Sequence, residues 1–367
     1  MRFTLQREVL LKPLAQVVNV VERRHTLPVL ANVLVRVENG LLSMTGTDME
    51  VEMVARVAID EGIDGECTIH ARKFFEIVRE LPDGSRITVS QNGEKVSVQA
   101  GRSRYSLVTL PANDFPALDE MQVSEQVTVP ESALKELLDR TAFAMAQQDV
   151  RHYLNGLLFD LREHVLRCVA TDGHRLALCE TPLEHGQSGR RQIIVPRKGV
   201  LEMQRLLEGG SDRQITLELD RSHIRIRRDD VTFTSKLIDG KFPDYEAVIP
   251  IGADRHVKVD REALRAALQR TAILSNEKYR GVRLEITPGL LKTSAHNQEQ
   301  EEALEEVEAQ TSVDGLAIGF NVTYLLDALT ALRDEFVLLQ MRDAHSSTLI
   351  QGADNPQARH VVMPLRL

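Results

Sequence analysis

The sequence indicates its fold through a segment that occurs three times. The copies are TGTDMEVEMVARV at 45–57, VATDGHRLALCETPL at 169–183 and TSAHNQEQEEALEEVE at 293–308. Thr47, Thr171 and Ala295 occupy the matching position in each copy and are equally spaced along the chain. A constant spacing over such long intervals indicates one structural unit repeated in tandem.

An amphipathic helix is predicted upstream of each copy. Apolar residues recur there every three or four positions, as on one buried helical face. The three sets are Leu10, Leu14, Val17, Val18 and Val21; Leu134, Leu137, Leu138, Thr141 and Met145; and Leu264, Ala267, Leu268 and Thr271. Pro130, ahead of the second set, is typical of a helix start.

A second helix and alternating strands are predicted downstream. The helices are IHARKFFEIVREL at 69–81, IVPRKGVLEMQRLL at 194–207 and IGFNVTYLLDALTAL at 318–332. Strands with period-2 patterning follow, and Phe115-Pro116 and Phe242-Pro243 close the first two copies. The sequence therefore predicts an α+β fold of three tandem domains, 1–124, 125–252 and 253–367, each with two helices packed on β-sheets.

Each predicted domain also divides into two halves, because the order of one helix followed by several strands occurs twice. Six such half-units favour a curved array with helices on one face and strands on the other. A tandem duplication that forms no ring is the alternative that the pattern leaves open.

Composition restricts the class of protein. The chain has 367 residues, of which 43% are hydrophobic and 27% charged. It has no apolar run long enough to span a membrane and no secretory leader pattern at Met1–Glu8. Cys67, Cys168 and Cys179 show no CxxC spacing and read as reduced thiols in the cytoplasm. We expect a globular cytoplasmic protein without membrane contact.

Positive charge gathers on the predicted helices, although the net charge of the chain is −9. The clearest basic sites are Arg23-Arg24, Arg72-Lys73, Arg197-Lys198 and Lys278–Arg280, and a polar turn spans Gln147–Tyr153. Each basic pair alone is better interpreted as an ordinary solvated helix end. Together they favour contact with phosphates without base reading, on a mildly basic helical face.

The sequence gives little support for an enzymatic function. Asp172 and His174 could act as an acid–base pair or as metal ligands, since at i and i+2 in an extended segment they share a face. No HExxH, CxxC, GxSxG, GxxxxGK[ST] or GxGxxG motif accompanies them, so we expect no catalytic residue, no metal and no cofactor. A sequence-specific DNA-binding protein is also disfavoured, because the sequence has neither a helix-turn-helix pattern nor a basic composition.

The chain resembles the bacterial sliding clamp family, the β subunit of DNA polymerase III, along its whole length. The motifs that carry the resemblance are LPVLANVL at 27, TGTD at 45, ARKFFEI at 71, QDVRHYLNG at 148, ATDGHRLA at 170, VPRKG at 195, FTSKLIDGKFPDY at 233, SNEKYRGVRL at 275 and VVMPLRL at 361. The resemblance implies a processivity factor for the replicative polymerase. It also implies a head-to-tail homodimer whose six domains close a ring around double-stranded DNA.

Dimer contacts follow from the resemblance. Tyr105 and Leu107 would meet Ile273 and Leu274 of a second copy, and the cations Lys73, Arg102 and Arg104 would face the acidic run Glu299 to Glu306. Without the family, that acidic run reads as a solvated loop.

The resemblance also assigns ligand contacts. DNA-contacting positions would be Arg24, Arg72, Gln148, His152 and Tyr153. A pocket between the second and third domains would take apolar-tipped peptides of partner proteins. Its residues would be Leu154, Thr171, Gly173, His174, Arg175, Leu176, Pro243, Val248, Tyr279, Asn321, Tyr324, Ser347, Val362, Met363, Pro364, Leu365, Arg366 and Leu367.

Two features bear on that pocket. Read without the family, the C-terminal HVVMPLRL is simply the last strand of a sheet. Glu246-Ala247 lacks the basic residue usual in the family and His345 replaces a usual aliphatic residue, so the peptide preference at the rim is expected to differ.

The implied partners are the polymerase α subunit, other polymerases, mismatch-repair proteins and ligase, each carrying a clamp-binding peptide. A separate clamp-loader complex driven by ATP is also implied, because the chain has no nucleotide-binding motif with which to open a closed ring.

Overall fold

The computed structural model describes residues 1–22, 27–183, 189–228 and 230–366. Contacts divide the chain into two compact units. The first combines Met1–Glu131 with Leu201–Leu237, and the second combines Ser132–Val200 with Ile238–Leu367.

A short strand leads directly into each of the six α-helices of the described ranges. The pairs are β1 (Arg2–Gln6) with α1 (Arg7–Val20), β6 (Gly65–His70) with α2 (Ala71–Glu80), β10 (Glu125–Pro130) with α3 (Glu131–Asp139), β14 (Arg191–Pro196) with α4 (Arg197–Leu206), β18 (Arg255–Asp260) with α5 (Arg261–Thr271), and β22 (Leu316–Asn321) with α6 (Val322–Ala331). The last strand residue can cap the helix: the Asp260 carboxylate accepts from the Ala263 amide at 2.7 Å. This arrangement gives each predicted domain two helices.

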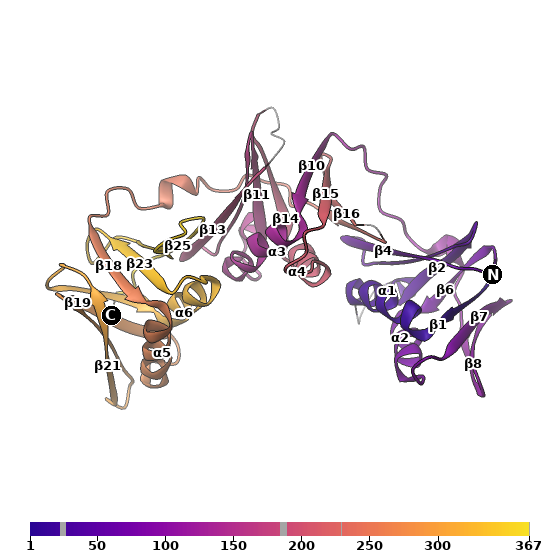
Figure 1. Ribbon diagram of the computed structural model, residues 1–367, viewed down its shortest axis with the longest axis horizontal. Coiled ribbons are helices and arrows are strands. Elements are labelled where there is room, and N and C mark those ends of the chain that lie inside the picture. Colours follow the sequence, from indigo (N-terminus) through magenta and orange to yellow (C-terminus); the bar gives the residue numbers. More distant parts are fainter. Residues whose placement is uncertain (23–26, 184–188, 229, 367) are drawn as a thin grey trace. The chain divides into compact units, whose positions relative to one another are not determined.

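The first unit contains two antiparallel sheets. One has the order β5 (Gly62–Ile63), β1, β7 (Arg86–Asn92), β8 (Lys95–Ala100) and β9 (Ser103–Val108). The other has the order β10, β15 (Gln214–Leu219), β16 (His223–Arg228), β17 (Val231–Lys236), β4 (Val51–Ala58), β3 (Leu41–Thr47), β2 (Asn32–Glu38) and β6. Helix α1 packs on β3 and β4, and α2 lies beside it against β2 and β6 (Figure 1).

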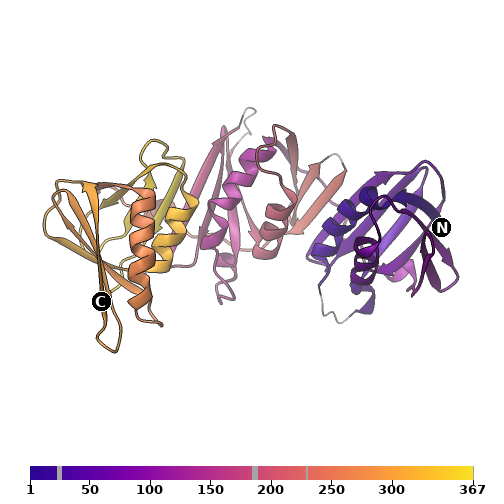
Figure 2. The same ribbon diagram turned by 60° about the horizontal axis from the view of Figure 1, so that its bottom comes forward.

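The second unit contains one long antiparallel sheet. Its order is β14, β11 (Gly156–Arg162), β12 (Val165–Thr171), β13 (Arg175–Pro182), β25 (Ala358–Val362), β24 (Thr348–Gly352), β23 (Phe336–Met341), β18, β21 (Glu302–Gln310), β20 (Leu290–His296), β19 (Gly281–Thr287) and β22. Helices α5 and α6 lie side by side in this unit (Figure 2).

Pairing between strands far apart in sequence builds both long sheets. In the first unit β17 pairs with β4, with Phe233 opposite Met53. In the second unit β13 pairs with β25, with Leu176 opposite Val361. The strands of the predicted second domain, 125–252, are therefore shared between the two units, and the domain bounds 1–124, 125–252 and 253–367 stay a prediction.

The core beneath the β13–β25 junction is apolar and includes the buried residues Leu158, Val169, Leu178, Phe242 and Tyr245. Short 3-10 helices occur in the connections of both units. They are η1 (Pro28–Ala31), η2 (Ala112–Asp114), η3 (Ala142–Ala144), η4 (His152–Leu154), η5 (Glu246–Val248) and η6 (Ala272–Leu274). No helix within the described ranges is both long enough and apolar enough to cross a membrane.

Candidate functional site

A tight turn between β12 and β13 forms one edge of the candidate site. The Thr171 hydroxyl donates to the Arg175 carbonyl at 2.6 Å, and the Asp172 carboxylate accepts from the backbone amides of His174 and Arg175 at 2.9 and 3.1 Å. Gly173 has a φ of +89°, which a side chain would strain. A Cβ there would also lie 3.0 Å from a guanidinium nitrogen of Arg151.

The first repeat contains the same turn. Thr47 donates to the Val51 carbonyl at 2.8 Å, and the Asp48 carboxylate accepts from the amides of Glu50 and Val51 at 2.9 and 2.8 Å. The Thr-Asp pair that marks the first two repeats is thus a turn-forming device.

The expectation that Asp172 and His174 lie in an extended segment was wrong, because Gly173 between them turns the chain. The Asp172 carboxylate bonds the backbone of the turn and also accepts from Arg175 Nε at 3.0 Å. It is therefore occupied in holding the turn. Within the described ranges there is no group of three or more His, Cys, Asp or Glu residues placed to hold a metal ion.

The C-terminal segment continues along this edge. Beyond β25, the Met363 amide donates to the His174 carbonyl at 3.0 Å. The chain then leaves β13, and the Leu365 amide donates to the Gly319 carbonyl of β22 at 2.7 Å. Met363 remains 45% exposed. The tail thus bridges two strands of the sheet and presents an apolar side chain at the junction.

A mainly apolar cavity of about 190 Å³ opens between the turn, the tail and η5. Its predicted lining residues are Leu154, Thr171, Gly173, His174, Arg175, Leu176, Pro243, Val248 and Met363. Arg151, Tyr153, Tyr245 and Val361 also line it, and the sequence reasoning did not assign them to a pocket. Two signals could have found some of them: Arg151 lies within the QDVRHY motif, and Val361 is two positions from Met363 on one strand face.

Arg175 lines this cavity, but its positive charge is paired with a carboxylate of the protein itself. Its guanidinium contacts the Asp327 carboxylate at 2.5 Å and donates to the Phe143 carbonyl at 2.9 Å. The same group lies over the ring of Tyr324, 4.6 Å from the centroid. Arg175 therefore connects the turn to α6 and stabilises this wall of the cavity.

Ion pairs hold the η5 wall of the cavity. The Glu246 carboxylate accepts from Arg162 and from Arg167, both at 2.9 Å. Burial acts to raise the pKa of Glu246, but its contacts with Arg162 and the nearby Arg190 and Arg167 outweigh it and lower the pKa. Glu246 thus anchors the segment that carries Val248 to strands β11 and β12.

The other predicted pocket residues lie outside this cavity. Ser347 lines a neighbouring cavity with Val248. Tyr279, Leu365 and Arg366 line another, and Pro364 joins Leu365 and Arg366 in a third. The remaining positions have structural roles or are not described: Asn321 caps α6, Tyr324 packs against Arg175, Val362 is buried in β25, and Leu367 lies outside the described residues.

The predicted DNA-contacting residues are dispersed. Arg24 lies outside the described residues, and Arg72 is half-buried in the first turn of α2. Gln148 and His152 are exposed around η4. Tyr153 differs from them, because it lines the apolar cavity and packs on the core beneath it.

The predicted dimer contacts lie in two places. Lys73 is exposed on α2, and Arg102, Arg104, Tyr105 and Leu107 lie on or beside β9. Ile273 and Leu274 lie in η6 of the second unit, where Ile273 is 77% exposed.

Part of the acidic run already has partners within the chain. Glu305 pairs with Arg270 at 2.7 Å and Glu306 pairs with Lys292 at 3.3 Å.

Three family models cover the chain in tandem. They describe the N-terminal, central and C-terminal domains of the DNA polymerase III beta subunit and match residues 1–119, 128–244 and 246–366. The chain belongs to the DNA polymerase III beta subunit family.

Relatives in this family match over the full length. The beta sliding clamp of Pseudomonas aeruginosa is 53% identical and that of Escherichia coli K12 is 50% identical, with 100% of both chains covered in each case. A crystal structure of the P. aeruginosa sliding clamp bound to griselimycin has a TM-score of 0.97, again with 100% of both chains covered. The sliding clamp of Caulobacter crescentus is 37% identical, with a TM-score of 0.93 over the whole of both chains.

These matches confirm two predictions from sequence. The fold is that of three tandem α+β clamp domains, and the resemblance to the polymerase III β subunit holds along the entire chain. The protein is therefore a sliding clamp of the bacterial replication machinery by family.

Proposed function

We propose that this chain closes as a head-to-tail homodimeric ring around duplex DNA and confers processivity on the replicative polymerase. The observation that carries the proposal is the tandem of three family domains spanning the chain. In that ring the domains would be 1–124, 125–252 and 253–367, so that two chains supply six.

Open sheet edges support the dimer. Strand β9 is the last strand of its sheet, and β21 pairs with β18 only at Ala309 and Gln310, which leaves its Glu302–Glu308 part bonded on one side. Exposed edges of this kind invite pairing with another chain. Because the two edges differ, pairing one with the other is a heterologous contact, which can close a ring when it is made twice.

The side chains at these edges are complementary. Val108 on β9 is 69% exposed and Leu304 on β21 is 64% exposed. Arg104 is exposed on the same strand as Val108, Arg102 is exposed directly before that strand, and Glu302, Glu305 and Glu306 lie near Leu304 on β21. An apolar contact framed by opposite charges would give both affinity and orientation. With Tyr105 and Leu107 against Ile273 and Leu274, and Lys73 on the cationic side, this is the dimer interface that we propose.

Duplex DNA would be held without sequence preference. Arg24 and Arg72 would neutralise phosphates, and Gln148, His152 and Tyr153 would add polar contacts. In an acidic chain with net charge −9, such contacts are few and screened by salt, which suits a protein that slides.

The apolar cavity would receive short peptides of partner proteins. Tyr153, Leu176, Val361 and the flexible side chain of Met363 offer an apolar surface that adapts to different apolar tips. The partners would include the polymerase α subunit, other polymerases, mismatch-repair proteins, ligase and the clamp loader, which would supply the work of ring opening. The site of action would be the cytoplasm.

We propose no catalytic activity for the chain. The carboxylate of Asp172, the residue most easily imagined as an acid or base, is occupied within its turn. Turnover of nucleotides or DNA that disappears in Asp172→Asn would contradict this part of the proposal.

Loading on a nicked DNA circle tests the ring. The protein is loaded with its ATP-dependent loader, and the circle is then cut. We expect the clamp to leave through the new ends and to remain when those ends are blocked. Retention on the linear DNA with open ends would contradict enclosure.

Light scattering tests the dimer. The wild type should have the mass of two chains at micromolar concentration, and Ile273→Asp should shift it towards one chain by placing a charge in the apolar contact. Lys258→Asp, on β18, is the control for an added acidic charge in the same unit. A strictly monomeric wild type would contradict the ring.

A further inference from the structure

Three further cavities adjoin the peptide cavity in the second unit. Val248 lines the peptide cavity and also a second cavity that extends to His345. His345 in turn lines a third cavity of about 510 Å³ with Gly319 and Arg366. Arg366 then separates this cavity from a fourth that contains His296. The four cavities are therefore neighbours that share lining residues, and we call this row of cavities around the C-terminal tail the path.

The charge along this path is of one sign. The ionisable side chains that line the four cavities are arginines, histidines and tyrosines, and no aspartate or glutamate lines them in the described part of the chain. This is unexpected in a chain with 54 acidic and 45 basic residues. A path that lacks carboxylates within an acidic protein favours an acidic ligand.

Most arginines of the path already have carboxylate partners. Arg151 pairs with Asp149 at 2.9 Å, Arg175 with Asp172 and Asp327, and Arg342 with Asp343 at 3.2 Å. Asp343 is itself held by the backbone amide of His345 at 2.8 Å. These groups are neutralised within the protein.

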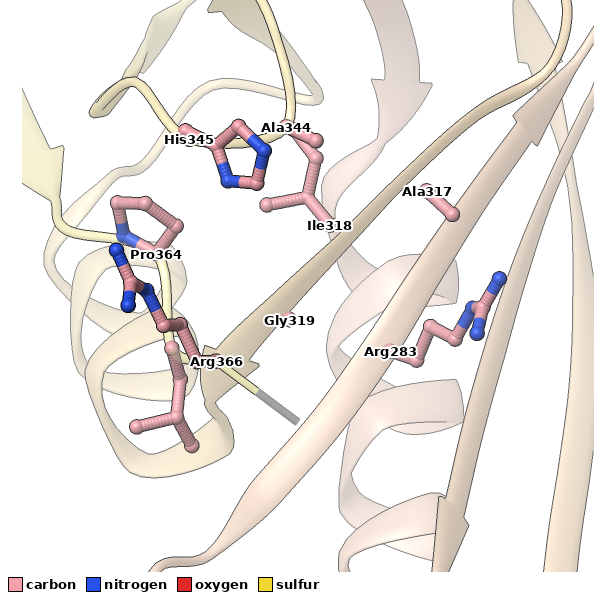
Figure 3. Close-up of a pocket in the computed structure, with 9 residues that line it drawn as sticks. Arg283, Ala317, Ile318, Gly319, Ala344, His345, Pro364 and Arg366 are labelled. Atoms are coloured by element: carbon pink, nitrogen blue, oxygen red, sulfur yellow. The ribbon is translucent and has the colours of Figure 1, made fainter.

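Arg283 and Arg366 are different. Both are exposed, and neither has an ion-pair partner among the described residues. Gly319 lies between them: its β22 position is paired with Arg283 of β19, and its carbonyl accepts from the amide of Leu365, next to Arg366 (Figure 3). Both arginines line the same cavity as Gly319, and their side chains extend to opposite sides of it (Figure 3).

The nearest acidic residue on the same strand is Glu285, two positions from Arg283 and therefore on the same face of β19. Its strand neighbour is Lys292, opposite Glu285 on β20, and Lys292 also pairs with Glu306. Glu285 is not part of the cavity wall, so Arg283 is the charged group of β19 that a ligand in the cavity would meet.

We infer that Arg283 and Arg366 form an anion-recognising subsite for acidic residues that flank the apolar tip of a partner peptide. The inference rests on the proposed peptide-binding function and adds to it the charge of the partner segment. The apolar tip fills the cavity beside Met363, and the flanking carboxylates enter the adjoining cavities that Arg283 and Arg366 both line, one carboxylate for each arginine. His345 lines both the second and the third cavity. We therefore expect peptide binding to be sensitive to a bulky peptide residue beside His345.

Fluorescence anisotropy with labelled peptides tests the subsite on the full-length protein. One peptide has an apolar tip with neutral flanks, and a series carries a Glu pair moved stepwise along either flank. We expect one member of the series to bind about 2- to 10-fold more tightly than the neutral peptide, as exposed ion pairs with two arginines allow. The gain should vanish between about 0.05 M and about 0.5 M NaCl.

Two variants and a control assign the gain to the subsite. Arg283→Ala should remove much of the gain and leave the affinity for the neutral peptide unchanged, and Arg366→Ala should also reduce the gain. Arg255→Ala removes an exposed arginine of the same unit that lines none of these cavities, and it should preserve the gain.

Several outcomes would overturn the inference. They are equal binding of acidic and neutral peptides, a gain that survives Arg283→Ala and Arg366→Ala, and a gain lost equally in Arg255→Ala. A short single-stranded oligonucleotide that binds through Arg283 while acidic peptides show no gain would assign the arginines to phosphate instead. The proposed peptide-binding function has its own test. If Met363→Ala does not change the affinity for the neutral peptide, that function is contradicted, whatever the result for the acidic peptides.

Discussion

Tyr245 donates a hydrogen bond of 2.6 Å from its hydroxyl to Oδ2 of Asp160, and both side chains are almost fully buried. The same carboxylate accepts from Arg162 at 3.0 Å and from Arg190 at 2.7 and 2.9 Å. Tyr245 directly precedes η5, so this network fixes the strand β11 to the wall of the peptide cavity. Its integrity should govern both acid stability and the shape of the cavity.

Asp160→Asn should destabilise the protein by about 1–3 kcal/mol, because it leaves the buried Tyr245 hydroxyl and two partly exposed arginines with a weaker acceptor. It should also change the dependence on pH. Burial acts to raise the pKa of Asp160, but hydrogen bonds from Arg190, Tyr245 and Arg162 outweigh it and lower the pKa to about 2. The stabilisation is therefore complete above about pH 4, the range of a free aspartate, and is lost as the pH falls towards 2.

Denaturant unfolding between these pH values measures the effect. Asp244→Asn is the matched control, since Asp244 is exposed and close in sequence to Tyr245. We expect a shallower loss of stability on acidification in Asp160→Asn than in the wild type or the control. Equal slopes in all three proteins would show that the network contributes nothing to acid stability.

Gly173→Ala should both destabilise the turn and weaken peptide binding. The new Cβ would occupy a φ of +89° and approach Arg151 to 3.0 Å. Gly84→Ala separates the two causes, because Gly84 has a φ of +72° and no heavy atom within 4 Å of the added Cβ. We expect a loss of about 1–2 kcal/mol from the backbone in both variants and a further loss only in Gly173→Ala. If Gly173→Ala and Gly84→Ala have similar thermal unfolding and similar peptide affinity, the proposed clash with Arg151 is refuted.

Met363→Ala should weaken partner-peptide binding by about tenfold, because it removes apolar surface from the cavity wall. Dimer mass should not change, and light scattering on the same samples checks this. Removal of residues 363–367 should weaken binding further, since it also deletes the hydrogen bond from Leu365 to Gly319. If the deletion abolishes the dimer, the tail is a structural element of the ring rather than part of a binding site.

His360→Leu should make the protein less sensitive to mild acid. His360 is buried in β25, and burial together with Arg140 and Arg175 lowers its pKa to about 3. An unfolded histidine titrates near pH 6.5, so between these values the unfolded chain binds the extra proton and stability falls as the pH falls. Thermal unfolding at about pH 7 and pH 5 should show a smaller drop in His360→Leu than in the wild type. His164→Asn, at an exposed position, should retain the full drop, and a wild type without any drop would contradict the argument.

Local patterns predicted where the helices lie, although the second apolar set was too long, because α3 ends at Asp139 and Thr141 and Met145 lie beyond it. The apolar set Leu10, Leu14 and Val17 lies on the buried face of α1, and Leu264 and Leu268 do the same on α5. Helical periodicity depends on neighbours three or four residues away, so it can be read from a short window. The Thr-Asp pairs were recognised as repeat markers, but their common role as a turn needed the hydrogen bonds around Asp48 and Asp172.

The candidate site was predicted in part. Residues of the ATDGHRLA motif around Gly173 and the tail residue Met363 meet in one cavity, as the resemblance implied. Tyr153 was assigned to DNA and lies in the cavity wall, because η4 turns its side chain onto the core. Glu246 was expected at the rim, and its pairing with Arg162 could not be foreseen from two positions so far apart in the chain.

The sequence alone determined the repeated units, their helices and strands, and the family, because these depend on side-chain order within each stretch of chain. Only the tertiary structure decided that β17 joins β4 and that β13 joins β25. Strand pairing depends on backbone hydrogen bonds between distant segments. The order of apolar and polar residues within one segment does not show which other segment it pairs with. The cavity at the β13–β25 junction exists for the same reason, since its walls come from segments that meet only when the sheet has formed.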